Sequence, residues 1–262
     1  APRTVRGRAT YDAVLFNLVA IALAFLVLPV PVVLAAGGGL EAVAKAHANG
    51  RAVRVLVIGD SFASELADGL KWAFRGKSGF VVEKRTKAAT GLVRVDTYDW
   101  FKATKGFLEG RKIDIVVVSM GGNDRQDIRV RGNRFERFTI GWRMEYLKRV
   151  ERFAAMLAKS KAAVYWVGLP TVRSSRMSKD YSRFNRYFRD VADNHGIVFV
   201  DVDKVLPNKG KSYAAFGKGL DGRTVRLRDR DGVHLTIVGA KVVGRHVAGK
   251  IRADLRQAGS TR

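Results

Sequence analysis

Five short apolar runs alternate along this chain with segments of helical spacing, and this alternation limits the possible folds more than any other feature. Each run has the length and composition of a strand that is covered on both faces of a parallel sheet. The runs are residues 53–58, 80–84, 113–120, 163–169 and 197–202. The helical segments are residues 61–74, 98–108, 142–160, 180–194 and 236–255. Right-handed crossovers then predict a three-layer α/β/α sandwich around a five-stranded parallel sheet.

Three long polar stretches follow the carboxyl ends of predicted strands. They are residues 125–138, 171–179 and 207–230, and we expect them to be irregular. Open α/β sheets bind their ligands at this edge. These stretches are therefore predicted to form the walls of a substrate site.

The N-terminal part of the chain has a different character. Residues 14–36 are apolar apart from Asn17 and follow Arg3, Arg6 and Arg8. At 1.5 Å per residue a helix of this length reaches roughly 34 Å, enough to cross the inner membrane. A cleaved signal peptide, with residues 18–28 as its apolar region, is the alternative. Both interpretations place the rest of the chain outside the cytoplasm, in a periplasmic or other extracytoplasmic location.

This division predicts three parts. Residues 1–36 are expected to be a signal or membrane-anchor segment that contains the N-terminal hydrophobic helix. Residues 37–50 are small and glycine-rich, which predicts a linker with about one helical turn. Residues 51–262 are then the catalytic domain.

Composition excludes several kinds of site. The chain has no cysteine, so it has no disulfide, thiolate metal site or cysteine nucleophile. Its four histidines include no pair at i,i+4 spacing, and we expect no metal.

The net charge of +24 would attract nucleic acid, anionic lipid or anionic polysaccharide. Because the charge is spread rather than gathered in an arm or recognition helix, we expect no specific nucleic-acid partner.

Three motifs at the ends of predicted elements carry chemistry. Ser61 follows the first strand in a Gly-Asp-Ser turn, where its backbone N–H and the helix dipole could stabilise an oxyanion, although a serine N-cap is the simpler use. Asp231 precedes His234 by three residues and could orient its imidazole, although an Asx-turn would also explain it. Asn123, after two glycines, could donate to an oxyanion or form an ordinary turn. All three motifs lie at one predicted sheet edge, which favours a common site.

These motifs resemble the blocks of the SGNH (GDSL-type) hydrolase superfamily, over residues 51 to the last helix. The similarity is to an exported bacterial branch whose substrate is not established, and it implies the flavodoxin-like SGNH hydrolase fold. It further implies Ser61 as nucleophile, His234 as general base and Asp231 as the residue that orients it. The oxyanion donors would be the backbone N–H groups of Ser61 and Gly91 and the side chain of Asn123.

The resemblance implies a serine esterase that works through an acyl-enzyme and needs no cofactor. The chain also has neither P-loop nor dinucleotide-binding glycine spacing. With export, acylated cell-envelope glycans or other esters are the expected substrates. An O-acyltransferase on envelope carbohydrate and a catalytically silent polyanion-binding envelope protein are the alternatives.

Four arginines lie in or beside the loops that are expected to surround the site. They are Arg94, Arg125, Arg173 and Arg228. A substrate that is anionic or linked to a glycan would suit them, and we predict Arg94, Arg125 and Arg228 as substrate-binding residues. Arginines are also common by chance in a chain of this charge.

Overall fold

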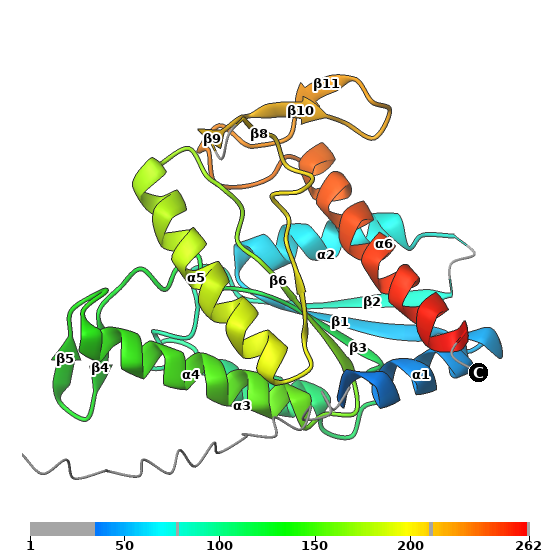
Figure 1. The fold of residues 1–262 in the computed structure, drawn as a ribbon, viewed down its shortest axis with the longest axis horizontal. Coiled ribbons are helices and arrows are strands. Elements are labelled where there is room, and N and C mark those ends of the chain that lie inside the picture. The colour runs from blue at the N-terminus through cyan, green and yellow to red at the C-terminus, as the bar shows by residue number, and fades with distance from the viewer. Residues whose placement is uncertain (1–34, 77–78, 210–211, 261–262) are drawn as a thin grey trace, which may run out of the picture. The chain divides into compact units, whose positions relative to one another are not determined.

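The central feature of the computed structural model, which describes residues 35–76, 79–209 and 212–260, is a parallel five-stranded sheet (Figure 1). Its strands run in the order β2-β1-β3-β6-β7. Their bounds are β1 Val53–Gly59, β2 Phe80–Thr86, β3 Ile115–Ser119, β6 Ala163–Val167 and β7 Val198–Val200. All neighbouring pairs are parallel, which confirms the fold class predicted from the apolar runs. The predicted N-terminal hydrophobic helix falls mainly on residues 1–34, outside the described residues.

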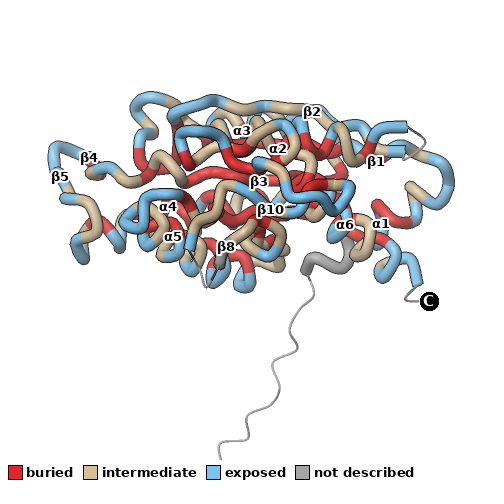
Figure 2. The backbone as a smooth tube through the Cα atoms, turned by 90° about the horizontal axis from the view of Figure 1, so that it is seen from above, coloured by how far each residue is buried: buried red, intermediate tan, exposed pale blue. Residues whose placement is uncertain are grey.

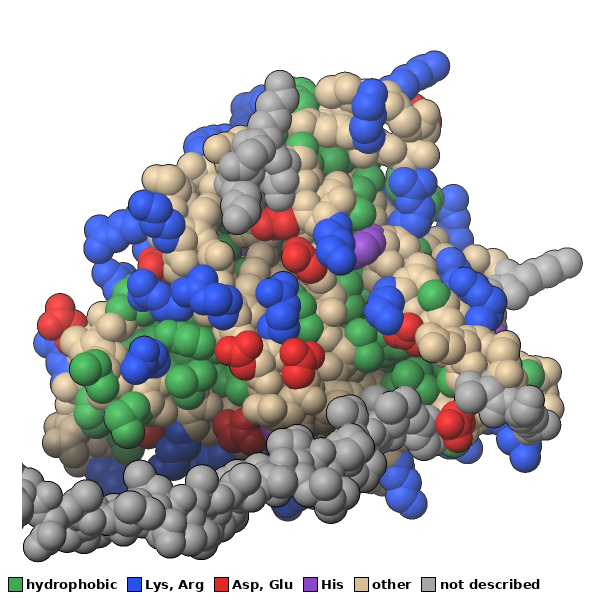
Figure 3. Space-filling model, viewed as in Figure 1, with side chains coloured by type: hydrophobic (Ala, Val, Ile, Leu, Met, Phe, Trp, Pro, Cys, Tyr) green, Lys and Arg blue, Asp and Glu red, His purple; other side chains and the backbone are tan. Residues whose placement is uncertain are grey.

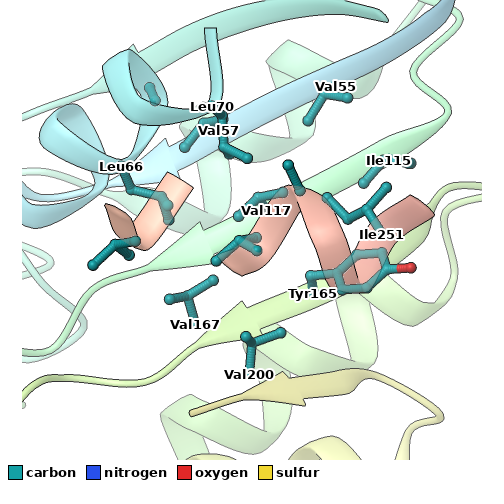
Figure 4. Packing of buried hydrophobic residues seen from close by; sticks show 14 of the residues in the cluster. Val55, Val57, Leu66, Leu70, Ile115, Val117, Tyr165, Val167, Val200 and Ile251 are labelled. Carbon is teal, nitrogen blue, oxygen red and sulfur yellow. The ribbon is translucent and has the colours of Figure 1, made fainter. Parts of the chain in front are cut away.

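Alternating residues of the strands build two apolar cores, one on each face of the sheet. Val55 and Val57 belong to the core beneath α1 Ala35–Ala48, α2 Ser61–Ala73 and α6 Ile237–Ser260. Leu56 and Ile58 belong to the core beneath α3 Trp100–Leu108, α4 Ile140–Ala158 and α5 Ser175–Asn194. Buried positions accordingly run along the sheet between its helices (Figure 2). Figure 4 shows the first core from close by.

Helix α1 corrects the prediction of a linker at residues 37–50. Leu40, Val43 and Ala44 are buried in the same core as α6. Their i, i+3, i+4 spacing forms an apolar stripe, and packing of that stripe outweighs the low helix propensity of the preceding glycines. The domain therefore starts earlier in the chain than residue 51. Within the described residues, no helix is both long enough and apolar enough to cross a bilayer.

The stretches expected to be irregular contain short hairpins. β4 Ile128–Val130 pairs with β5 Asn133–Phe135, β8 Asn208–Lys209 pairs with β9 Ser212–Tyr213, and β10 Phe216–Lys218 pairs with β11 Thr224–Arg226. Helix α5 also begins earlier than expected, since Ser174 caps it by accepting a hydrogen bond from the N–H of Met177. Along the chain, the hairpins and the start of α5 still follow the carboxyl ends of strands of the central sheet, as the prediction of loops required.

Candidate active site

The first wall of the site is the turn from β1 into α2. Gly59 has φ +139°, and a Cβ there would lie 1.8 Å from the carbonyl oxygen of Ser119, so the turn requires glycine. Asp60 is the N-cap of α2, because its carboxylate accepts a hydrogen bond of 3.0 Å from the N–H of Phe62. Ser61 is thus the first helical residue and not the cap, which removes the simplest structural use for its hydroxyl.

A chain of hydrogen bonds joins this serine to a loop 173 residues away in sequence. The Nε2 atom of His234 lies 3.0 Å from the Oγ of Ser61. The other ring nitrogen, Nδ1, lies 2.5 Å from Oδ2 of Asp231. With Nδ1 protonated and donating to the carboxylate, Nε2 is left as an acceptor for the serine hydroxyl proton. The structure therefore brings together the three residues that the motifs singled out.

Asp231 is held as an anion within its own turn. Its second oxygen, Oδ1, accepts hydrogen bonds from the N–H groups of Val233 (2.8 Å) and His234 (3.0 Å). Partial burial alone would raise its pKa, but the bond from the His234 ring and those from the backbone lower the pKa to about 2. The carboxylate is thus ionised at neutral pH and can stabilise a positively charged imidazole.

Glu65 adds a second carboxyl group next to the imidazole. It lies one helical turn after Ser61 on α2, and its Oε2 accepts a hydrogen bond of 3.0 Å from the N–H of Leu235. Burial raises the pKa of Glu65 to about 7, and the Leu235 N–H and the nearby His234 partly oppose this. Burial alone would lower the pKa of His234, but Asp231 and Glu65 raise it above its usual value. Sequence reasoning missed Glu65, although its i+4 spacing from Ser61 could have indicated it.

The expected oxyanion donors lie on neighbouring segments. The Nδ2 of Asn123 donates to the carbonyl of Thr90 (3.1 Å) and to Oδ2 of Asp60 (3.3 Å). These two partners directly precede Gly91 and Ser61 in the chain. Asn123 therefore joins the segments that carry the other two donors. An oxyanion between these segments would receive an N–H of Asn123 in place of one of the two present acceptors, of which Asp60 is the longer contact.

The loop that contains Gly91 is fixed by a buried carboxylate. Asp124 accepts hydrogen bonds from the N–H groups of Leu92 (3.1 Å) and Val93 (2.8 Å). A Cβ on Gly91 would lie 2.2 Å from this carboxylate, so the close approach requires glycine. Tyr146 donates a further hydrogen bond of 2.9 Å to Asp124. Burial raises the pKa of Asp124, and these donors oppose that shift.

Arg149 supports the same loop from α4. Its Nη1 donates to the carbonyls of Leu92 (2.9 Å) and Val93 (2.6 Å). Sequence reasoning gave no role to Asp124, Tyr146 or Arg149. Tyr146 and Arg149 share the buried face of α4 at i,i+3 spacing, and an arginine in an apolar stripe was the available signal.

The arginines predicted to bind substrate lie in three different environments. Arg94 is exposed and pairs with Asp96 (2.7 Å), and Arg125 is mostly buried against Asp180 (2.8 Å). Arg228 is only 2% exposed and donates to the carbonyls of Thr171 (2.8 Å) and Val233 (2.6 Å). The prediction that Arg228 lies on the surface of the site is wrong, because its guanidinium is buried and donates both to the segment after β6 and to the loop that carries His234.

Comparison with known proteins gives one family match and several similar folds. Residues 54–250 match a family model described as "Protein of unknown function (DUF459)". The fold is similar to that of Est24, a carbohydrate acetylesterase from Sinorhizobium meliloti (TM-score 0.54, 14% identity, 77% of this chain and 99% of that chain). It is also similar to an aryl esterase from M. smegmatis (TM-score 0.55, 14% identity, with the same coverage of both chains).

A third solved structure carries the superfamily name itself. A protein from Slackia heliotrinireducens that is assigned to the SGNH hydrolases has a TM-score of 0.52 and 17% identity, over 76% of this chain and 98% of that chain. A search of curated proteins found no significant match. The resemblance to the SGNH hydrolase superfamily is thereby confirmed at the level of the fold.

Proposed function

We propose that this chain, which belongs to the DUF459 family, is a serine esterase whose nucleophile is Ser61. One observation carries the proposal: the serine hydroxyl, the imidazole of His234 and the carboxylate of Asp231 form a continuous hydrogen-bonded chain. The serine stands at the start of a helix, at the carboxyl edge of the sheet. This is where a nucleophile gains both a base and the positive end of a helix dipole.

The reaction proceeds in two halves. Ser61 Oγ attacks the carbonyl carbon of the ester while His234 Nε2 takes the hydroxyl proton, and Asp231 stabilises the resulting imidazolium. The developing oxyanion accepts hydrogen bonds from the N–H groups of Ser61 and Gly91 and from Asn123. The imidazolium then returns its proton to the leaving alcohol, which leaves an acyl-enzyme. Water attacks this intermediate with His234 as base again, and the acid and free serine are released.

An acylated cell-envelope glycan is the substrate class that we propose. The basic composition, the exported location expected from residues 14–36 and the carbohydrate acetylesterase among the structural neighbours support it. Transfer of the acyl group to a second carbohydrate would use the same acyl-enzyme with a sugar hydroxyl in place of water. The silent-binder alternative is disfavoured, because a protein that only binds has no need of an aligned triad.

A fluorophosphonate probe tests the proposal directly, because it reacts only with an activated serine. The wild-type protein should be labelled, and peptide mass spectrometry should locate the label on Ser61. Ser61→Ala should remove the label together with hydrolysis of p-nitrophenyl acetate. Ser64→Ala, one turn further along α2, is the matched control and should keep both. Labelling that persists in Ser61→Ala, or turnover equal to the wild type, would refute the assignment.

A further inference from the structure

A large basic groove lies beside the proposed active site. It has a volume of about 1230 Å³ and is formed by α5, the segment after β6, the segment after β7 and the β8–β9 hairpin. Six cationic side chains line it: Arg173, Lys179, Arg183, Arg186, Arg189 and Lys204. Figure 3 shows Lys and Arg side chains gathered over α5 on this face of the molecule. The groove thus offers a strongly positive, open surface.

The two carboxylates in the groove leave most of this charge uncompensated. Asp203 accepts hydrogen bonds from the N–H (2.8 Å) and the hydroxyl (2.7 Å) of Thr171. Asp201 lies 3.7 Å from Arg189 and accepts from the N–H of Asp203. Both acids therefore have fixed partners in the groove wall.

Three of the cations have no such partner. Lys179, Arg186 and Lys204 are exposed, and none of them forms a hydrogen bond or ion pair with another residue in the described part of the chain. A bound anion would therefore find their charges available without breaking an existing contact.

Two contacts connect the groove to the catalytic elements. The N–H of Arg173 donates to the carbonyl of Gly232 (2.9 Å), inside the turn between Asp231 and His234. The hydroxyl of Tyr181 lies 3.4 Å from the carbonyl of Gly122, the residue before Asn123. One end of the groove is therefore in contact with both the histidine loop and the oxyanion segment.

The uncharged part of the lining suits a molecule rich in hydroxyl groups. Ser175 and Ser182 on α5 and Ser212 on β9 line the groove with exposed side chains. Grooves that bind a single nucleic-acid strand usually expose several aromatic rings on which the bases stack. This groove has two tyrosines among its lining residues, and Tyr181 is buried. The balance of charge and hydroxyl groups fits an anionic glycan.

We propose that this groove binds an anionic polysaccharide and presents its acyl ester to Ser61. The inference rests on the proposed esterase and narrows its substrate class to acylated polyanionic glycans. Anionic groups of the polymer contact Lys179, Arg186 and Lys204, and the acylated sugar lies at the end next to Arg173 and Tyr181. The ester bond that breaks and the water that adds are those of the proposed reaction.

The experiment compares two triple variants of the full chain. The groove variant is Lys179→Gln with Arg186→Gln and Lys204→Gln. The matched control removes three exposed cations from α3 and α4, as Lys102→Gln with Arg143→Gln and Lys148→Gln. The substrates are acetylated polygalacturonate, acetylated mannan as neutral polymer, and p-nitrophenyl acetate. Binding of unacetylated polygalacturonate and of a single-stranded oligonucleotide is measured in parallel at low salt.

The wild type should prefer the anionic polymer to the neutral one. In the groove variant, kcat/KM for acetylated polygalacturonate relative to p-nitrophenyl acetate should fall about tenfold, as expected for the loss of three exposed charges. The control variant should keep this ratio within about twofold. Equal losses in both variants would assign the effect to general surface charge and overturn the proposal, as would tighter binding of the oligonucleotide than of polygalacturonate.

Failure of the esterase itself would be seen separately. If the wild type hydrolyses none of the three esters, the proposed function is wrong. In that case the binding measurement still tests whether the groove holds an anionic polysaccharide. A selective loss of polygalacturonate binding in the groove variant would support the site, and equal binding by both variants would refute it.

Discussion

The two halves of the triad are built in opposite ways. Ser61 stands on a turn whose backbone is enclosed by the sheet, and the adjacent Asp60 is 2% exposed. His234 and Asp231 stand on a loop, with side chains that are 37% and 46% exposed. Ile58, Phe62 and Ala63 on either side of this turn are buried in the two cores, so apolar packing supports the serine half. Polar contacts within the loop support the histidine half. A substitution in the serine half should lower both the melting temperature and kcat. A substitution in the histidine half should lower mainly kcat.

Polar contacts of the histidine loop converge on its backbone. Arg228 donates to Thr171 and Val233, and the N–H of Asp229 donates to the carbonyl of His234 (2.8 Å). Because hydrogen bonds are directional, they can fix an imidazole at a surface where apolar packing is thin. The loop can therefore be both accessible to substrate and well ordered.

The largest expected effect is a loss of activity without a loss of stability, on substitution of the base in the histidine half. His234→Ala should lower kcat for p-nitrophenyl acetate by roughly 10³-fold or more, because the variant has no base for the serine proton. Its melting temperature should stay near that of the wild type, since the removed ring is half-exposed. Steady-state kinetics and thermal unfolding measure the two quantities. A variant that melts far below the wild type would contradict the proposed contrast between the halves.

Asn123→Ala tests the serine half and should have the next largest effect. The lost donor matters most when negative charge develops, so kcat should fall about 10²–10³-fold with a smaller change in KM. Stability should fall as well, because buried Asp60 loses the hydrogen bond to Oδ2. Asn123→Asp keeps the shape but loses the donor, and it should be equally impaired. An increase in KM alone would make Asn123 a residue that positions the substrate.

Arg228→Gln should have a smaller effect on turnover, in the range of about 10- to 10²-fold, as for other groups that only orient a catalytic residue. The shorter side chain leaves the carbonyls of Thr171 and Val233 without their donor, and the melting temperature should fall by several degrees. Arg230→Gln, at an exposed position of the same loop, is the matched control. Equal behaviour of the two variants would show that the buried guanidinium does not hold the loop.

These cases show why the sequence predicted some parts of the molecule better than others. Strands covered on both faces are continuous apolar runs, so the five-stranded sheet could be predicted. Helix α1 could not, because its glycines lower the local propensity and its stability comes from burial against α6. Local pattern predicts an element only where pattern and packing agree.

The same limit applies to the site. Ser61, Asn123 and His234 could be brought together because each follows or precedes a predicted element at the same edge of the sheet. Arg228 and Arg149 each donate to a carbonyl group that is 57 residues away in sequence, and nothing in the local sequence shows which distant backbone will face a side chain. For this reason the sequence predicted that Arg228 binds substrate, whereas the buried side chain supports the loop that carries His234.

The smallest expected effect concerns the carboxyl group that the two halves share. Glu65 belongs to α2 of the serine half, yet it accepts the N–H of Leu235 in the histidine half. Its pKa of about 7 means that it gains negative charge as the pH rises through neutrality, and that charge stabilises the protonated form of His234. The base must be neutral to act, so the acidic limb of kcat/KM lies at a higher pH than it would without Glu65.

Glu65→Gln should therefore shift this limb to lower pH. The amide oxygen can still accept the Leu235 N–H, so the loop keeps its contact and only the charge is removed. Asp68→Asn, an exposed position on the same helix, is the matched control and should leave the profile unchanged, because its carboxylate pairs with Lys84. A pH profile of kcat/KM for p-nitrophenyl acetate decides the matter. If the limb does not move in Glu65→Gln, the charge of Glu65 does not raise the pKa of His234, and the electrostatic link between the two halves is wrong.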